Sequence, residues 1–285
     1  MRSGKWLICC LFLLPVPAIR AQLPVSVGMA GGFAFYHGDL ARFYQSGVGP
    51  AAGTFARYSF EFPFSVRVNV LRGTVTSNDK IRPERKLNFR SPVTEVSLQL
   101  EFYVTRPKSG FRNYSIKYGR RKYHVYTFPV LTYVYTGIGR FSFNPKGRYP
   151  DGTWKPLQPL CTEGQGVFPT RDAPYKLSSL VIPVGVGMIF PMRDAFQFGF
   201  EISVRKTFTD YLDDVSLTYV NTAVLESAKG PLAAYFADPS RNLELTTTSP
   251  ATARGNPKNK DTYIFAFVTL QYDFGKTKKK KTFRI

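Results

Sequence analysis

The chain has 285 residues, of which 44% are hydrophobic and 15% aromatic, with a mean hydropathy of −0.17 and a formal net charge of +20. This composition excludes a helical membrane protein, because the most apolar stretch, residues 180–192, is shorter than the roughly 20 residues that a transmembrane helix needs. Only Cys161 follows the first 21 residues, which excludes an intramolecular disulfide and a thiolate metal cluster.

The N-terminal segment has the order of a secretory signal peptide. Arg2 and Lys5 precede an apolar run at 6–14, and small residues follow at 18–21. We expect cleavage after Ala21 and export of the mature chain. The predicted organisation is a signal peptide at 1–21, a single barrel domain at 22–275 and a basic periplasmic tail at 276–285.

Apolar and polar residues alternate with period two along the mature chain, whereas helical periodicity is nearly absent. The clearest segment is 93–105, and residues 196–204 repeat its pattern. One apolar and one polar face suit a strand with lipid outside and a polar lumen inside. The predicted strands are 25–36, 51–60, 65–75, 93–105, 125–143, 180–190, 196–204 and 263–274.

The connectors between these strands are of two kinds. Short turns at 61–64 and 191–194 are expected in the periplasm, and the connector at 106–122 is expected there too, although it is long. The remaining long connectors are expected to be extracellular loops. They are 38–50, 76–92, 144–179 and 209–261.

These features together predict an all-β fold, a transmembrane antiparallel β-barrel of about eight strands with long extracellular loops. Its expected location is the outer membrane of a double-membrane bacterium. A soluble periplasmic β-sandwich is the alternative. The predicted strands favour the barrel, because they are near ten residues long, whereas strands of globular proteins average about five to six.

Several charged residues are predicted to line the lumen. An eight-stranded barrel is narrow enough to be filled by its own side chains, so we expect a plug of paired charges and no free passage of solutes. A catalytic carboxylate pair is the alternative interpretation. The predicted polar network of the interior comprises Arg67, Glu95, Glu101, Glu201 and Arg205.

Basic residues without intervening acids gather on the predicted periplasmic side. We interpret them as a docking surface for an acidic partner or a lipid headgroup, and a solvated charged rim is the alternative. Nucleic acid, the usual partner of such a charge excess, is not expected for an exported barrel. The predicted docking residues are Arg106, Lys108, Arg112, Lys117, Arg120, Arg121, Lys122, Lys278, Lys279, Lys280 and Lys281.

A further basic group is predicted on the outer side, near the phosphates of lipopolysaccharide, with which Arg and Lys pair well. We therefore expect outer-membrane lipids and lipopolysaccharide among the partners. The residues of this group are Lys80, Arg82, Arg85, Lys86 and Arg90.

The only histidines available as a general base, His37 and His124, are predicted at opposite ends of the barrel and cannot share a site. The acidic group Asp210, Asp213 and Asp214 does not have the spacing of a calcium loop and is interpreted as loop structure. We expect no catalytic residue, no metal and no cofactor. A lipid A-modifying enzyme, with His37 at the outer rim, is the alternative.

The segment that leaves the seventh predicted strand contains the run Thr207, Phe208, Thr209, Asp210, Tyr211, Leu212, Asp213 and Asp214. This run resembles the PorG-like outer-membrane barrels of the type IX secretion system. Residues 28–32 with 36–40, and the glycines at 137–139, are similar to other strands of that family. The resemblance implies a non-enzymatic barrel that docks on a periplasmic ring lipoprotein and other secretion-system proteins. A general envelope-stabilising or adhesin-like barrel is the alternative.

Overall fold

A computed structural model describes residues 24–60, 62–105, 112–118, 121–127, 130–192, 195–240 and 250–275, with the backbone alone for 112–118 and 121–127. The predicted signal peptide and basic tail lie outside these residues. The strands are β1 (Val25–His37), β2 (Gly49–Ser59), β3 (Phe64–Asn78), β4 (Asn88–Tyr103), β5 (Arg112–Tyr118), β6 (Arg121–Thr127), β7 (Leu131–Phe143), β8 (Lys146–Arg148), β9 (Trp154–Pro156), β10 (Ser178–Pro191), β11 (Phe196–Thr207) and β12 (Thr262–Asp273).

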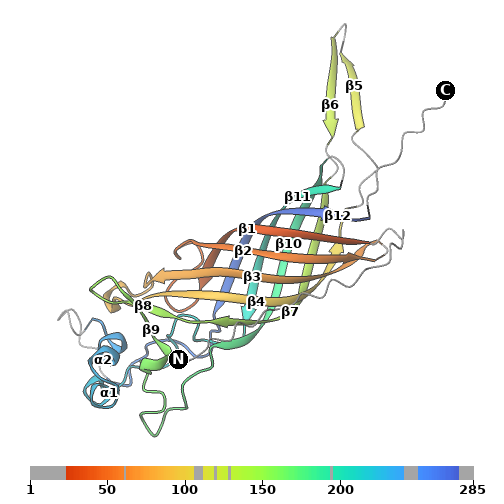
Figure 1. The fold of residues 1–285 in the computed structure, drawn as a ribbon. Helices are drawn as coiled ribbons and strands as arrows, with labels where there is room; N and C mark the ends of the chain where they lie inside the picture. Colours follow the sequence, from red (N-terminus) through yellow and green to blue (C-terminus); the bar gives the residue numbers. More distant parts are fainter. Residues whose placement is uncertain are drawn as a thin grey trace, which may run out of the picture.

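Eight of these strands form a closed antiparallel barrel in the order β3-β2-β1-β12-β11-β10-β7-β4, and pairing of β3 with β4 closes it. The first and last strands are neighbours, from Ser26 beside Asp273 to His37 beside Thr262. Figure 1 shows the strands tilted around the barrel. The predicted eight-stranded barrel is confirmed, and a two-sheet sandwich is excluded because the sheet closes on itself.

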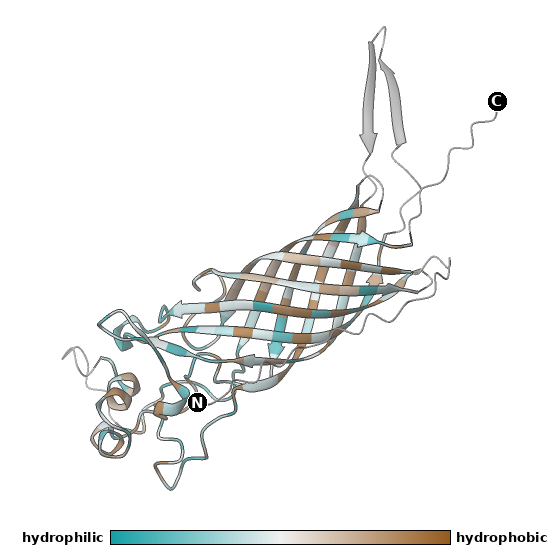
Figure 2. Cartoon of the chain, in the orientation of Figure 1, coloured by the Kyte–Doolittle hydropathy of each residue, from teal (hydrophilic) through white to brown (hydrophobic). Residues whose placement is uncertain are grey.

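The alternation of each barrel strand explains the closure. In β4, Leu98 and Leu100 are half exposed on the outer wall, whereas Glu95, Gln99 and Glu101 are buried in the lumen. Hydrophobic and polar segments accordingly alternate along the barrel strands in Figure 2. Because successive strand residues point to opposite faces, this pattern fixes the inner and outer walls.

The barrel has two different ends. At the cap end, four connectors join β1 to β2, β3 to β4, β7 to β10 and β11 to β12. At the termini end lie Pro24, Gly275 and the connector from β4 to β7, which contains the separate β5–β6 hairpin. Figure 1 shows α1 and α2 at the cap end.

The structure corrects two predicted segments. The segment 125–143 is not one strand, because β6 ends at Thr127 and β7 begins at Leu131. The predicted loop 76–92 is shorter in the structure, since β3 and β4 stay paired out to Asn78 and Asn88. The inward residue Phe89 is fully buried there, which explains why the pairing continues beyond the predicted ends.

The connector 209–261 contains two helices that the sequence analysis did not predict. They are α1 (Thr222–Lys229) and α2 (Pro231–Ala237). Asn221 caps α1 by accepting hydrogen bonds from backbone N–H groups, and Gly230 separates the two helices. Both helices are short, so two turns each gave little periodic signal. No helix among the described residues is long and apolar enough to cross a membrane.

Candidate functional site

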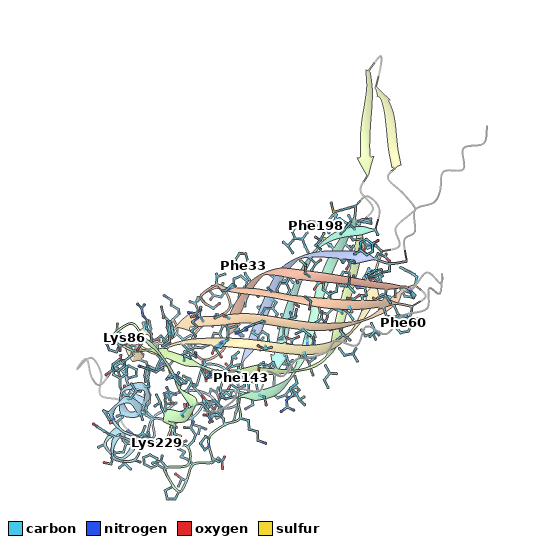
Figure 3. The ribbon with its side chains drawn as sticks, viewed as in Figure 1. Phe33, Phe60, Lys86, Phe143, Phe198 and Lys229 are labelled. Atoms are coloured by element: carbon cyan, nitrogen blue, oxygen red, sulfur yellow. The ribbon has the colours of Figure 1, made fainter. Side chains whose placement is uncertain are left out.

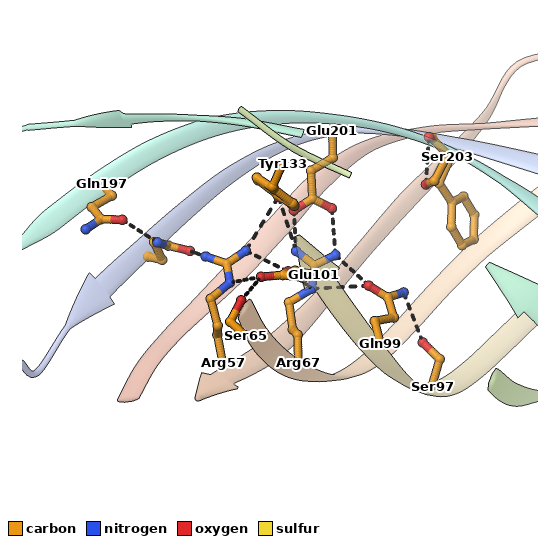
Figure 4. A network of polar contacts seen from close by, with 12 residues as sticks. Arg57, Ser65, Arg67, Ser97, Gln99, Glu101, Tyr133, Gln197, Glu201 and Ser203 are labelled. Atoms are coloured by element: carbon orange, nitrogen blue, oxygen red, sulfur yellow. Dashed lines mark hydrogen bonds and ion pairs between the residues drawn. The ribbon is translucent and has the colours of Figure 1, made fainter. Parts of the chain in front are cut away.

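Three arginines and three glutamates pair inside the barrel, and two of each lie in the half nearer the termini end. Glu101 lies 2.6 Å from Arg57 and 3.2 Å from Arg67, measured from carboxylate oxygen to Nε. Arg67 also pairs with Glu201. All four side chains are almost completely buried. Figure 4 shows how these residues from β2, β3, β4 and β11 meet in the lumen.

The third pair lies closer to the cap. Nε of Arg205 is 3.3 Å from Oε2 of Glu95, and the hydroxyl of Tyr263 donates to the same oxygen at 2.8 Å. The guanidinium of Arg205 lies 4.6 Å from the ring centroid of Phe265. Three positive and three negative side chains thus balance, as burial of charge in a narrow lumen requires.

Arg57 was not among the predicted residues of the lumen. Its guanidinium binds Glu101 through Nε and Nη2 and contacts Gln271 through Nη1. The alternation of β2 contained the signal, because Arg57 is two positions from inward-facing Phe55 and therefore shares its face. The five predicted interior residues are all in the lumen, but without Arg57 their charges would not balance.

Apart from the Arg205–Glu95 pair, the half of the lumen nearer the cap is mainly apolar. Phe141, Phe265 and Val181 are almost completely buried there. Leu40 and Leu212, from two connectors at the cap end, belong to the same cluster and have about 1% exposure or less. The lumen therefore has a polar layer and an apolar layer, rather than the polar interior throughout that the sequence predicted.

The run that carried the family resemblance forms the centre of the cap. Thr207 ends β11 and donates to the carbonyl oxygen of Asp261 at 2.7 Å. The ring of Tyr211 stacks on Tyr175 with centroids 4.3 Å apart. Phe208 alone of the aromatic and apolar residues in this run is exposed. The run joins the connector after β11 to the one after β7.

Two aspartates of this run bind side chains of distant connectors. Asp213 accepts a hydrogen bond from the hydroxyl of Tyr36 in β1. Asp214 accepts one from the hydroxyl of Tyr175 at 2.6 Å and one from Thr162 at 2.5 Å. These contacts join the end of β1 and the connector after β7 to the connector after β11.

Burial raises the pKa of the cap carboxyls. It raises the pKa of Asp214 to about 6 and that of Asp210 to about 7. Burial raises the pKa of Asp213 and Asp261 well above the usual range, and in Asp261 the charge of Asp213 adds to the effect. The cluster therefore holds protons near neutral pH.

An ion pair between two connectors of the cap was not predicted. Nη1 of Arg254 lies 3.0 Å from Oε1 of Glu163, whose carboxylate also accepts the backbone N–H groups of Ser216 and Leu217. These residues are 91 positions apart in sequence, so alternation or spacing could not have indicated the pair. No group of three or more His, Cys, Asp or Glu side chains in the described ranges is arranged to hold a metal ion.

Only four of the predicted docking residues lie in the described part of the chain, in the connector at the termini end. Arg112 and Lys117 lie in β5, Arg121 and Lys122 in β6, and Lys117 is opposite Lys122 in the hairpin register. The remaining predicted docking residues, Arg106, Lys108, Arg120, Lys278, Lys279, Lys280 and Lys281, lie outside the described residues.

The histidines are at opposite ends of the fold. His37 ends β1 at the cap end and is exposed, whereas His124 lies in β6 at the connector from β4 to β7. Cys161 is buried.

In the predicted outer basic group, Arg85 is buried and pairs with Asp79, so it is not available to lipopolysaccharide, contrary to the prediction. Lys86, at the cap end in Figure 3, is exposed.

The outer wall carries a continuous apolar band. Outward residues in every barrel strand are predominantly apolar, and Arg72, Arg140 and Lys206 come next toward the cap in β3, β7 and β11. Such a band, bounded by aromatic and charged rows, is the surface that a membrane-spanning barrel presents to lipid. Exposed aromatic residues ring the termini end: Tyr58, Phe60, Phe62, Phe64, Phe102, Phe196, Tyr272 and Phe274. Figure 3 labels Phe60 at this end.

The chain has the architecture of an outer-membrane β-barrel. Solved structures with similar folds include Neisserial surface protein A (8% identity, 88% of this chain and 97% of that chain covered, TM-score 0.40). A second is a major outer membrane protein from Thermus thermophilus (12% identity, 87% of this chain and 97% of that chain covered, TM-score 0.37). A third is OprG from Pseudomonas aeruginosa (9% identity, 88% of this chain and 96% of that chain covered, TM-score 0.34). No family model and no curated protein matches the chain. The fold assignment rests on the strand pairing of this chain itself.

Proposed function

We propose that the chain is a non-enzymatic structural and interaction barrel of the outer membrane. The observation that carries this proposal is the combination of an apolar outer wall with a lumen filled by paired charges and aromatic side chains. A filled lumen argues against a channel. An exposed lone His37 argues against general acid–base chemistry at the outer rim.

The finer role that we propose is docking on periplasmic ring components of the type IX protein secretion machinery. Two features support it. The cap contains the run from Thr207 to Asp214 that resembles this family, and the β5–β6 hairpin at the opposite end is rich in Arg and Lys. Basic side chains favour an acidic partner surface. The interaction would then use the termini end, while the cap faces outward.

A crosslinking pull-down from outer membranes tests the docking role. The intact chain is compared with a variant that lacks residues 276–285 and carries Arg120→Gln, Arg121→Gln and Lys122→Gln. The matched control neutralises Lys86, Lys176 and Lys229, which are exposed at the cap end. We expect a ring lipoprotein to copurify with the intact chain and the control and to be lost from the termini-end variant.

A general envelope-stabilising or adhesin-like barrel is the second candidate, and the ordered cap with two helices favours it. Its signature in the same experiment is distinct. All three chains would then insert in the membrane and capture no secretion component, which would overturn the docking role and leave the barrel itself standing.

A further inference from the structure

Three neighbouring strands, β11, β12 and β1, carry outward side chains in matched rows across the outer wall. The strand register aligns each row. With about 3.4 Å per residue, rows four residues apart are separated by about 13–14 Å along the strands. From the cap toward the middle of the barrel the rows are His37–Thr262–Lys206, Phe35–Ile264–Val204 and Phe33–Ala266–Ile202.

A basic groove of about 860 Å³ is lined by all three residues of the first row. Arg85 and Arg254 line it but are committed to Asp79 and Glu163. The acid in its lining is Asp39, whose pKa burial raises. The exposed cations of the groove are Arg42, Arg82, Lys206, Lys258 and Lys260. The groove therefore presents a surplus of positive charge that the protein leaves unneutralised.

An apolar hollow of about 320 Å³ includes the third row. The small side chain of Ala266 lies between Phe33 and Ile202 in the register, and Val186 and Met188 of β10 extend the lining. Figure 3 labels Phe33 on this wall of the barrel. The hollow is open to the outside, where a lipid-facing wall meets acyl chains.

The groove and the hollow face the same side of the barrel and lie one above the other. We propose that together they bind one phosphorylated glycolipid of the lipid A class, with its phosphates in the basic groove and an acyl chain in the hollow. Charge-assisted bonds from Arg and Lys recognise phosphate, and basic pockets beside an apolar wall suit lipid headgroups. Several separate cations fit a headgroup with more than one phosphate. The inference rests on the proposed outer-membrane location.

Binding to the full mature chain in nanodiscs tests the proposal. The probes are bis-phosphorylated lipid A, phosphatidylglycerol and inorganic phosphate, added to the intact chain and followed by native mass spectrometry. The groove variant carries Arg82→Gln, Lys258→Gln and Lys260→Gln, and the hollow variant carries Ala266→Trp. The groove variant removes three cationic hydrogen-bond donors, so we expect it to lose lipid A affinity at least about tenfold.

Each variant has a matched control. The charge control neutralises Arg148, Lys176 and Lys229, which are exposed at the cap end outside the groove. The hollow control is Ala56→Trp, which fills a different apolar hollow of the outer wall. We expect both controls to bind lipid A like the intact chain and Ala266→Trp to bind it more weakly. Equal affinity of groove variant and charge control would overturn the proposal.

The other probes separate lipid A from related ligands. Equal affinity for phosphatidylglycerol, or competition by inorganic phosphate with no effect of Ala266→Trp, would overturn the assignment to a glycolipid. Heat-modifiable migration in gels reports whether each chain forms a barrel in the membrane. A chain that never inserts contradicts the proposed function, whereas inserted chains that all bind lipid A equally contradict only the lipid site.

Discussion

The hydroxyl of Tyr36, at the cap end of the first strand, donates a hydrogen bond to the carboxylate of Asp213, 177 residues later in the chain. The same hydroxyl also lies 3.1 Å from Oδ1 of Asp261. A carbon added at Gly38 would collide with both the Tyr36 hydroxyl and Asp261, so the turn after β1 must pass close to this pair. The start of the barrel is thereby joined to the connector that precedes its last strand.

Tyr36→Phe removes this junction. The change leaves the carboxyls of Asp213 and Asp261 buried without their shared donor, which costs about 1–3 kcal/mol for an unsatisfied buried group. We expect the cap to open and the connector after β11 to become sensitive to protease while the barrel remains folded. Limited proteolysis in detergent measures this.

Tyr44→Phe is the control for that change, because Tyr44 is an exposed tyrosine of the connector after β1. It should leave the cleavage pattern of the intact chain unchanged. Equal protection of the cap in Tyr36→Phe and in the intact chain would contradict the role of the Tyr36–Asp213 bond.

The raised pKa of Asp210 makes cap stability depend on pH. Its pKa of about 7 in the folded cap lies above the ordinary value of 3.8, so the folded state binds more protons between these values. The contribution of this group is therefore fully present below about pH 4 and is lost as the pH rises through about 7. Asp214, with a pKa of about 6, acts in the same direction.

We expect hydrogen exchange in residues 205–216 to become faster, after correction for intrinsic exchange, as the pH rises from 5 to 8. Asp210→Asn should flatten this dependence and slow exchange at pH 8, since the replacement stays neutral. Asp172→Asn, at an exposed position of the cap end, serves as control. Stabilisation of the cap with rising pH would contradict the argument.

The eight barrel strands were predictable because strand alternation is a local property. Glu95, Glu101 and Glu201 belong to the face of their strand that alternates with outward-facing apolar residues, and that placement alone assigns them to the lumen. Strand lengths were less predictable, since β3 and β4 continue past a polar, proline-containing stretch whose inward residues, such as Phe89, pack above the lumen.

The cap could not be predicted in the same way, because its contacts join connectors that are far apart in sequence. Glu163 meets Arg254 only because two different connectors fold over the same end of the barrel. The run around Asp213 was found by its resemblance to a family, but its partners Tyr36 and Tyr175 were not. The docking residues of the termini end remain a prediction.

Glu101→Gln tests the paired charges of the lumen. It removes the partner that Arg57 and Arg67 share, and an uncompensated buried charge costs about 3–5 kcal/mol. We expect a lower urea midpoint for barrel unfolding in lipid vesicles. Glu226→Gln, at an exposed position of α1, is the control.

A double variant makes the test specific to pairing. Arg57→Met combined with Glu101→Leu restores charge balance, with Arg67 paired to Glu201 and Arg205 to Glu95. We expect the double variant to be more stable, by about 1–3 kcal/mol, than the sum of the separate effects of Arg57→Met and Glu101→Leu predicts. Simple additivity would show that the two charges act independently and would contradict the network.

The polar and the apolar layer of the lumen each block the passage of solutes, so a solute would have to cross both. Arg57 and Arg67 fill the polar layer, whereas Phe141 and Phe265 fill the apolar one, with Leu212 closing it from the cap. Vesicles that contain the intact chain should therefore exclude small sugars in a swelling assay. Truncation of both arginines to Ser should leave them closed, because the aromatic layer remains. Passage of sugars through the intact chain would contradict the sealed interior and favour a channel. Passage only after truncation of the arginines would show that the aromatic layer does not block sugars by itself.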